Sequence, residues 1–217
     1  MKLALVNPNT SIATTDVMVQ IAAETAGARA TVLGHTATFG VTLITEPSAL
    51  AEAAKAVAAL APVLRYADAV IVAAFGDPGL DALRAALDVP VTGIAEAAMA
   101  EAAKGERRFA VVTTTPHLCD QIAETASRYR HRRFAGTWTT PGDPSALMAD
   151  PAALEAALAG AIKQAVREGG AEAVVIGGGP LAIAARVLAA TAPVPLIEPV
   201  PAAVRHSLRR AMAWMGA

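Results

Sequence analysis

Four short polar segments hold most of the side chains with which this chain could bind or transform a small molecule. They are NPNTS at 7–11, FGDPG at 75–79, TTTPHLC at 113–119 and GGGP at 177–180. Each follows an apolar run of strand length, and parallel sheets bind ligands beyond the carboxyl ends of their strands. Hydroxyls, amides and backbone N–H groups beside helix starts suit a small anion or carbonyl compound. If two halves of the chain face each other, we expect these segments to converge on one cleft.

The best candidates for substrate contact are hydroxyl and amide side chains in two of these segments. Such groups could grip a carboxylate or an imide without bringing charge, although turn formation and helix capping are the alternative role. The glycines at 177–179 could present N–H groups to an oxyanion or enolate, or they could only permit a tight turn. The candidate substrate-binding residues are Asn9, Thr10, Phe75, Gly76, Thr113, Thr114, Gly178 and Gly179.

The stretch IVAAFGDPGL at 71–80 has the layout that usually presents a catalytic group at a strand tip, but Ala73, Ala74 and Phe75 carry none. Two nearby side chains could replace it. His117 has a ring suited to proton transfer at neutral pH, and a solvated helix-start residue is an equally good interpretation. Cys119 should stand in the first turns of a helix, which would lower its thiol pKa, although a lone cysteine is more often a small buried apolar residue.

Three further polar residues have simpler interpretations. Asp77 is predicted to cap the helix that follows FGDPG, in preference to contacting substrate. Glu96 is predicted to stabilise the first turn of its helix through the helix dipole. His35 is read as a loop histidine without a role.

Composition excludes several classes of protein. A formal net charge of −1 and an aromatic content of 4% argue against a nucleic-acid partner. No continuous apolar stretch of membrane-spanning length occurs, and MKLALVNPNTS is read as a first strand in place of a signal peptide, so a cytoplasmic protein is expected. The spacings indicate neither a metal site nor a dinucleotide cofactor. The 54% hydrophobic content favours a homo-oligomer.

Apolar strand-length runs alternate with Ala-rich helical patterns along the whole chain. Such alternation predicts an α/β fold with parallel sheets flanked by helices. Strands are expected at LALV, ATVLG, AVIVAA, FAVVT and AVVIG, and helices at 12–26, 48–66, 80–87, 116–128, 151–168, 181–190 and 200–214.

An internal echo suggests two related halves. ADAVIV at 67–72 recurs as AEAVVI at 171–176, and two further landmarks recur in the same order at nearly the same shift. We therefore predict two pseudo-symmetric, Rossmann-like α/β halves, the first made of residues 1–98 with 199–217 and the second of residues 99–198. Chance similarity between Val/Ile-rich strands is the alternative.

The segments NPNTS, FGDPGL, PVTGIAEAA, VVTTT, GGGPLA and PVPLIEPVPAAV together resemble the aspartate/glutamate racemase superfamily, and within it the hydantoin (and allantoin) racemase branch. The resemblance runs in order over nearly the whole chain. It implies two α/β domains with the active site between them, no cofactor, and two catalytic cysteines. One cysteine from each half would act on opposite faces of the substrate's α-carbon.

By that resemblance the cysteines should stand at Ala74 and Gly178, and the internal echo pairs the same two positions. Neither residue can accept a proton, so the resemblance implies an isomerase-family protein that does not use two thiols. It would act on a small hydantoin-like or carboxylate substrate, with His117 or Cys119 as the candidate base. The alternatives are a non-catalytic binding protein for such a ligand, a lyase or decarboxylase reaction on the same scaffold, and, least favoured, an engineered knockout.

Overall fold

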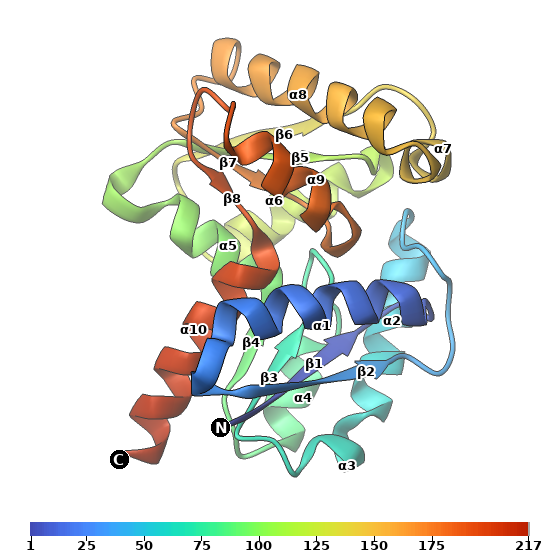
Figure 1. The fold of residues 1–217 in the computed structure, drawn as a ribbon, viewed down its shortest axis with the longest axis vertical. Coiled ribbons are helices and arrows are strands. Elements are labelled where there is room, and N and C mark those ends of the chain that lie inside the picture. Colours follow the sequence, from blue (N-terminus) through green and yellow to red (C-terminus); the bar gives the residue numbers. More distant parts are fainter. Residues whose placement is uncertain (217) are drawn as a thin grey trace. The chain divides into compact units, whose positions relative to one another are not determined.

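The computed structural model describes residues 1–216, which form two compact units, each built on a four-stranded parallel sheet (Figure 1). The first unit comprises Met1–Ala97 together with the chain from Val200 onward, and the second comprises Ala98–Pro199.

The sheet of the first unit has the strand order β2-β1-β3-β4. Its strands are β1 (Lys2–Asn7), β2 (Thr31–Thr36), β3 (Ala69–Val72) and β4 (Val91–Gly93). The helices that accompany them are α1 (Ile12–Ala26), α2 (Pro47–Ala59), α3 (Ala61–Leu64), α4 (Leu80–Ala86), α5 (Ile94–Ala102), which runs on past Ala97, and α10 (Pro199–Met215), with a 3-10 turn at Gly27–Arg29.

The sheet of the second unit has the equivalent order, β6-β5-β7-β8. Its strands are β5 (Phe109–Thr113), β6 (Phe134–Thr139), β7 (Ala173–Ile176) and β8 (Leu196–Ile197). Its helices are α6 (Cys119–Arg128), α7 (Pro144–Ala149), α8 (Pro151–Arg167) and α9 (Ala182–Ala189), with 3-10 turns at Lys104–Glu106, Pro116–Leu118 and Gly179–Leu181. Two parallel sheets with one strand order confirm the predicted fold class.

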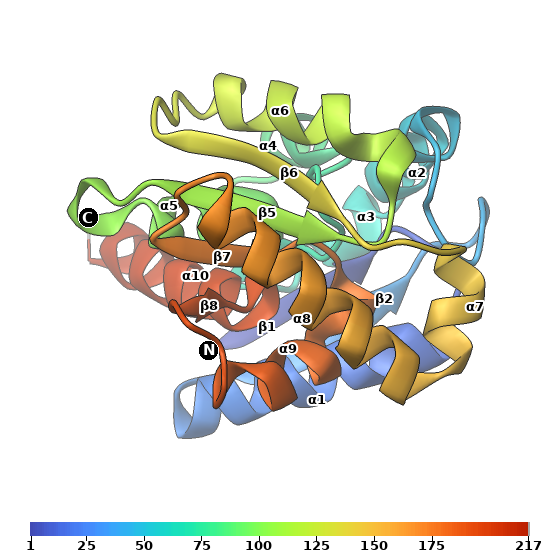
Figure 2. The ribbon, with the colours of Figure 1, turned by 90° about the horizontal axis from the view of Figure 1, so that it is seen from above.

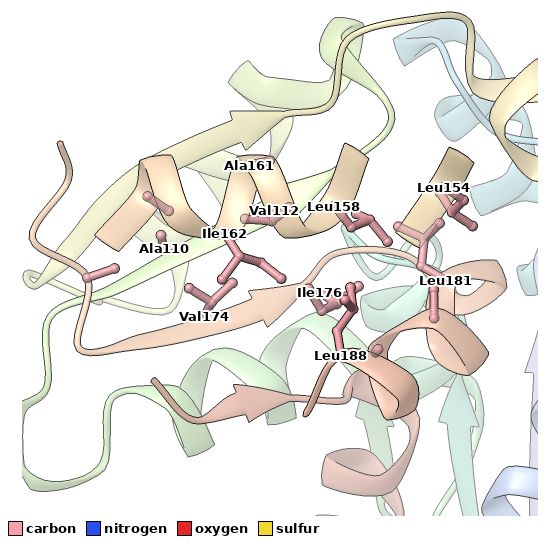
Figure 3. Close-up of a cluster of buried hydrophobic side chains, with 14 residues drawn as sticks. Ala110, Val112, Leu154, Leu158, Ala161, Ile162, Val174, Ile176, Leu181 and Leu188 are labelled. Carbon is pink, nitrogen blue, oxygen red and sulfur yellow. The ribbon is translucent and has the colours of Figure 1, made fainter. Parts of the chain in front are cut away.

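The apolar runs that predicted the strands are the buried centre of each sheet. Every residue of β3, β5 and β7 is buried, because helices cover both faces of a parallel sheet. In the second unit, α6 and α8 lie on opposite faces (Figure 2). Figure 3 shows the core on the α8 face, where alternate strand residues meet α8 and the segment from Leu181 to Leu188. The labelled strand residues are Ala110, Val112, Val174 and Ile176.

Several elements differ from the prediction. The helix expected over 48–66 is two helices, since Pro62 stands in the first turn of α3 and cannot continue α2. The strand expected over AVIVAA ends at Val72, and β4, β6 and β8 were not predicted. Two of the unpredicted strands have only two or three residues, and the third, FAGTWT, is a half-buried edge strand without an apolar run.

Across residues 1–216, we find no helix that combines the length and the apolar character needed to cross a membrane.

Candidate active site

In the first unit the segments after β1 and β3 begin side by side. The strands are neighbours in the sheet, and the pairing continues past the end of β3 through a 2.8 Å hydrogen bond from the Ala73 N–H to the Val6 carbonyl. The NPNTS segment and the FGDPG segment therefore leave the same edge of the same sheet, as the sequence predicted for two of its four segments.

Asn7 organises the NPNTS segment from inside the protein. Its Nδ2 donates to the Asn9 Oδ1 at 2.8 Å, to the Ser11 carbonyl at 3.0 Å and to the Thr15 Oγ1 at 3.0 Å. Its Oδ1 accepts the Asn9 N–H at 3.2 Å. Ser11 then caps α1 by accepting the Thr14 N–H. The network fixes the loop before any ligand arrives.

Asn9 is left as a fixed hydrogen-bond donor. Its Oδ1 accepts from the Asn7 Nδ2 and from the Ser11 N–H at 2.9 Å, which sets the orientation of the amide. Its Nδ2 makes no hydrogen bond to any residue from 1 to 216, although the side chain is only 5% exposed. Thr10 is half-buried, and its N–H is bonded to the Val41 carbonyl. This loop can therefore offer an amide N–H to an acceptor such as a carboxylate or an imide oxygen.

The turn after β3 is anchored by Asp77 to a helix other than the predicted one. The buried carboxylate accepts the Ala95 N–H through Oδ1 and the Glu96 N–H through Oδ2, both at 2.8 Å. Asp77 therefore caps α5, and the expectation that it caps α4 is wrong, since the N-cap residue of α4 is Gly79 and no side chain caps that helix. Asp77 was assigned to α4 because that helix follows it directly in the sequence. However, the Asp77 backbone has a left-handed φ of 53°, and its side chain reaches the junction between β4 and α5.

Gly93, at the end of β4, makes room for this anchor. A Cβ at position 93 would coincide with the carboxylate of Asp77. The Glu96 side chain continues the arrangement, accepting from the Arg84 Nη2 at 2.8 and 2.7 Å, so it has an ion-pair partner besides the helix dipole. Ala74, Phe75 and Gly76 consequently stand on a turn fixed at Asp77.

In the second unit the Thr triplet and the glycine triplet are joined. The Thr113 Oγ1 donates to the Gly177 carbonyl at 2.8 Å and lies 3.0 Å from the Thr115 Oγ1, so these hydrogen bonds link the two segments. Thr114 is 4% exposed, and its hydroxyl has no hydrogen-bond partner within residues 1–216. Thr114 is therefore the member of the triplet that is available to a ligand.

Ala74 and Gly178 occupy matching places in the two units. Each stands two residues beyond its strand, β3 ending at Val72 and β7 at Ile176, and each is partly exposed. Gly178 has an extended backbone with φ of 162°, which any residue adopts. Gly179 is buried and opens the 3-10 turn.

The two candidate bases lie on the 3-10 turn and helix that follow Thr115. His117 is exposed within the 3-10 turn. Cys119 is partly buried, and burial together with the charge of Asp120 raises the pKa of its thiol. The predicted lowering by the helix start is therefore wrong, because desolvation and a like charge outweigh it. Cys119 is poorly suited to act as a thiolate base at neutral pH.

This raised pKa predicts slow alkylation of Cys119. At pH 7 we expect iodoacetamide to label the folded protein more slowly than a cysteine peptide, with a rate that rises through alkaline pH, because only the thiolate reacts. Asp120→Asn should speed labelling by removing the charge that raises the thiol pKa. Glu124→Gln, on the same helix, is the matched control and should leave the rate unchanged, and equal rates for all three proteins would contradict the assignment.

One polar residue at this end of the sheet was missed from the sequence. Thr140 follows β6, and its N–H donates to the Thr113 carbonyl at 3.0 Å. Its Oγ1 is buried without a hydrogen-bond partner among the described residues. The only sequence signal for Thr140 was the polar turn TTPGD at 139–143. That turn marks a strand end only once FAGTWT is recognised as a strand.

His35 was expected to be a loop residue, but it lies in β2, and its Nε2 is 2.8 Å from the Tyr66 hydroxyl.

Comparison with known proteins identifies the family. A family model described as Asp/Glu/Hydantoin racemase matches residues 3–207. The chain belongs to the Asp/Glu/hydantoin racemase family. Among curated relatives, the hydantoin racemase of Rhizobium meliloti is 40% identical over 142 residues, and that of Paenarthrobacter aurescens is 35% identical over 139. Each alignment covers 64% of this chain but only 58% and 59% of the respective relative, less than two thirds of its length.

Solved structures give the same assignment over the full chain. The allantoin racemase from Klebsiella pneumoniae superposes with a TM-score of 0.91 at 30% identity, covering 100% of this chain and 89% of that one. The allantoin racemase from Pseudomonas fluorescens gives 0.90 at 28% identity, covering 100% and 92%. Arylmalonate decarboxylase gives 0.65 at 17% identity, covering 97% and 92%, a likeness of fold alone. For a member of this racemase family, the strand tips described above are the candidate active-site segments.

Proposed function

We propose that this chain is an isomerase that transfers a proton at the α-carbon of a small hydantoin-like or carboxylate substrate. The observation that carries the proposal is the match to the Asp/Glu/hydantoin racemase family over residues 3–207. The likeness over the whole chain to two proteins described as allantoin racemases supports a cyclic ureide or hydantoin as the substrate class.

The free donors on the strand tips are consistent with such a substrate. Asn9 offers an amide N–H and Thr114 offers a hydroxyl, and both belong to loops held by their own hydrogen bonds. Neutral donors of this kind bind carboxylate or imide oxygens, and they place no charged side chain beside the α-carbon of the substrate. Thr10, Phe75, Gly76, Thr113, Gly178 and Gly179 complete the proposed binding residues, and the Thr113 hydroxyl also holds the Gly177 carbonyl.

We further propose that the reaction does not use a pair of thiols. The 217 residues contain one cysteine, so two cysteines of one chain cannot share the proton transfer. Ala74 and Gly178, the positions assigned by family resemblance, follow equivalent strands in the two units and carry no ionisable group. His117 is the better candidate base, because burial and Asp120 raise the pKa of Cys119. Action without a cofactor, a cytoplasmic location and a homo-oligomer belong to the same proposal.

Proton NMR in D₂O would test the function directly. With 5-substituted hydantoins, allantoin, aspartate or glutamate, we expect the Cα–H signal of one compound to disappear faster than in a protein-free control. His117→Asn should abolish the exchange, whereas Cys119→Ser should leave most of it. General acid–base catalysis contributes about 10²- to 10⁴-fold, so loss of the base should be readily measured.

A non-catalytic binding protein is the second candidate, and the absence of an ionisable group at Ala74 and Gly178 favours it. In that case a ligand would show line broadening in the same spectra without any Cα–H exchange. Thr114→Val should then weaken binding, since it removes the free hydroxyl and keeps the side-chain volume. Exchange that persists in both the His117 and Cys119 variants would contradict both assignments of the base.

A further inference from the structure

A basic turn lies at the end of the second unit's sheet opposite to the strand tips. After α6 the chain turns through Tyr129–Arg133 and enters β6 at Phe134. The Phe109 N–H at the start of β5 donates to the Arg133 carbonyl at 3.2 Å, which fixes this turn beside the amino ends of β5 and β6. Thr113 and Gly177 lie at or just beyond the carboxyl ends of their strands, so the turn is separate from the second unit's strand tips.

Two hollows flank this turn and share three of its residues, Arg130, His131 and Arg132. The first, about 380 Å³, is otherwise lined by residues of α6 and by Phe134. The second, about 250 Å³, extends to the segment from Ala103 to Phe109. Pockets for small molecules begin at about 300 Å³, so the first hollow is large enough for a compact metabolite.

The charge of both hollows is strongly positive. Arg107 and Arg133 line the second hollow in addition to the two shared arginines, and Glu106 is the acidic residue in its lining. No acidic residue lines the first hollow. His131 adds little positive charge at neutral pH, because burial lowers its pKa.

Arg130 and Arg132, which line both hollows, have no partner for their guanidinium groups in residues 1–216, whereas Arg107 and Arg133 do. Arg107 donates to the carbonyls of Glu101 and Ala102, and Arg133 lies 3.5 Å from Glu172. The guanidinium groups of Arg130 and Arg132 make no hydrogen bond or ion pair with any residue from 1 to 216. Guanidinium groups bind carboxylate and phosphate oxygens through paired N–H donors.

The rest of the first hollow suits an organic anion better than a bare ion. Ala123, Ala126 and Phe134 form an apolar wall, and Ser127 adds one hydroxyl. The turn itself is anchored by hydrogen bonds from the Arg130 N–H to the Ser127 carbonyl and from the His131 N–H to the Ala126 carbonyl, both at 2.9 Å. Free cationic groups thus stand on a fixed turn above an apolar surface.

We propose that the Arg130–Arg132 turn is a binding site for a small organic oxyanion, a phosphate ester or a carboxylate, distinct from the candidate active site. Its anionic group binds between Arg130 and Arg132, and its body lies over Ala126 and Phe134. The site is independent of the proposed isomerase function and can bind its ligand whether or not the strand tips are catalytic.

Calorimetric titration at constant ionic strength would test this, with glycerol 3-phosphate, phenyl phosphate, citrate and benzoate as probes. We expect at least one probe to bind at one site per chain. The Arg130→Gln/Arg132→Gln double variant should bind it at least about tenfold more weakly, about 1.4 kcal/mol. Phosphate and carboxylate probes distinguish the two ligand classes. Arg167→Gln is the matched control, because Arg167 lies at the end of α8 in the same unit and, like Arg130 and Arg132, is exposed without a partner in residues 1–216.

A second control separates this site from the strand tips. Thr114→Val should leave the binding of the probe unchanged, and amide shifts in a ¹⁵N-labelled protein should move at 126–134. If the Gln double variant unfolds, Arg130→Lys/Arg132→Lys takes its place and should retain part of the affinity for the probe. Binding that is lost in Thr114→Val, equally reduced in Arg167→Gln, or absent for all four probes would overturn the proposal.

Discussion

Placing cysteines at positions 74 and 178 together is expected to create Cα–H exchange of a hydantoin at about 10² to 10⁴ times the rate of the parent chain. Both positions stand two residues beyond equivalent strands, and neither natural residue can carry a proton. If the family resemblance assigns the catalytic positions correctly, Ala74→Cys with Gly178→Cys supplies the pair of thiols that the parent chain lacks and adds it to the proposed base His117.

The structure can accommodate both side chains. Ala74 is partly exposed and already carries a Cβ. A Cβ at Gly178 would lie 3.2 Å from the Cγ and 3.3 Å from the Cδ1 of Leu181, a contact that a small shift of that flexible side chain relieves. The extended φ of Gly178 also imposes no backbone strain on a cysteine.

The single variants are the controls for this experiment. Ala74→Cys or Gly178→Cys alone supplies one thiol and should not invert an enantiomerically pure hydantoin faster than the parent chain does, whereas the double variant should, as followed by polarimetry or chiral chromatography. A double variant that is no faster than either single variant would show that these positions are not the catalytic pair.

Asp77→Ala is expected to lower the free energy of unfolding by about 3 to 7 kcal/mol. The change leaves two N–H groups at the start of α5 without their acceptor in a buried place, and each such group costs about 1 to 3 kcal/mol. About 1 kcal/mol of the loss arises from the left-handed φ of 53°, which alanine tolerates poorly. Urea unfolding followed by circular dichroism measures the difference.

Two other variants separate the causes. Asp77→Gly removes the carboxylate without the backbone strain and should retain most of the loss. Asp150→Ala removes an exposed cap, the acceptor for the Ala153 N–H at 3.1 Å, and should cost about 1 kcal/mol. If Asp77→Ala costs no more than Asp150→Ala, the buried anchor contributes nothing beyond an ordinary cap.

The fold was predictable because the central strands are buried on both faces. FAVVT and AVVI have to be continuously apolar because they lie between two layers of helices. Such a run can be recognised from the local sequence alone, without knowledge of which strands pair with it. FAGTWT at the edge of its sheet is half-buried along its whole length, so its residues follow no apolar run. The strands at 91–93 and 196–197 are too short to produce any periodicity.

The sequence predicted which segments form the candidate site, but it did not predict the hydrogen-bond partners of the residues in them. Asn9 and Thr114 were selected as candidates because parallel sheets bind ligands beyond the carboxyl ends of their strands, where polar side chains can reach them. Thr113 looked equivalent to Thr114 in the sequence, and only the Gly177 carbonyl distinguishes them. The acceptor role of Asp77 depends on a helix start 18 residues further along, a relation that no local pattern encodes.

Position 93 and position 77 form an epistatic pair. A side chain at 93 would occupy the volume of the Asp77 carboxylate, so position 93 tolerates a larger residue only when Asp77 is also replaced. When Asp77 is replaced by a smaller residue, the space beside Gly93 that the carboxylate filled becomes empty. A larger residue at position 93 can then fill that space without a steric clash. A library that varies position 93 alone would therefore score it as invariant, whereas a library that varies positions 77 and 93 together would also recover larger residues at 93.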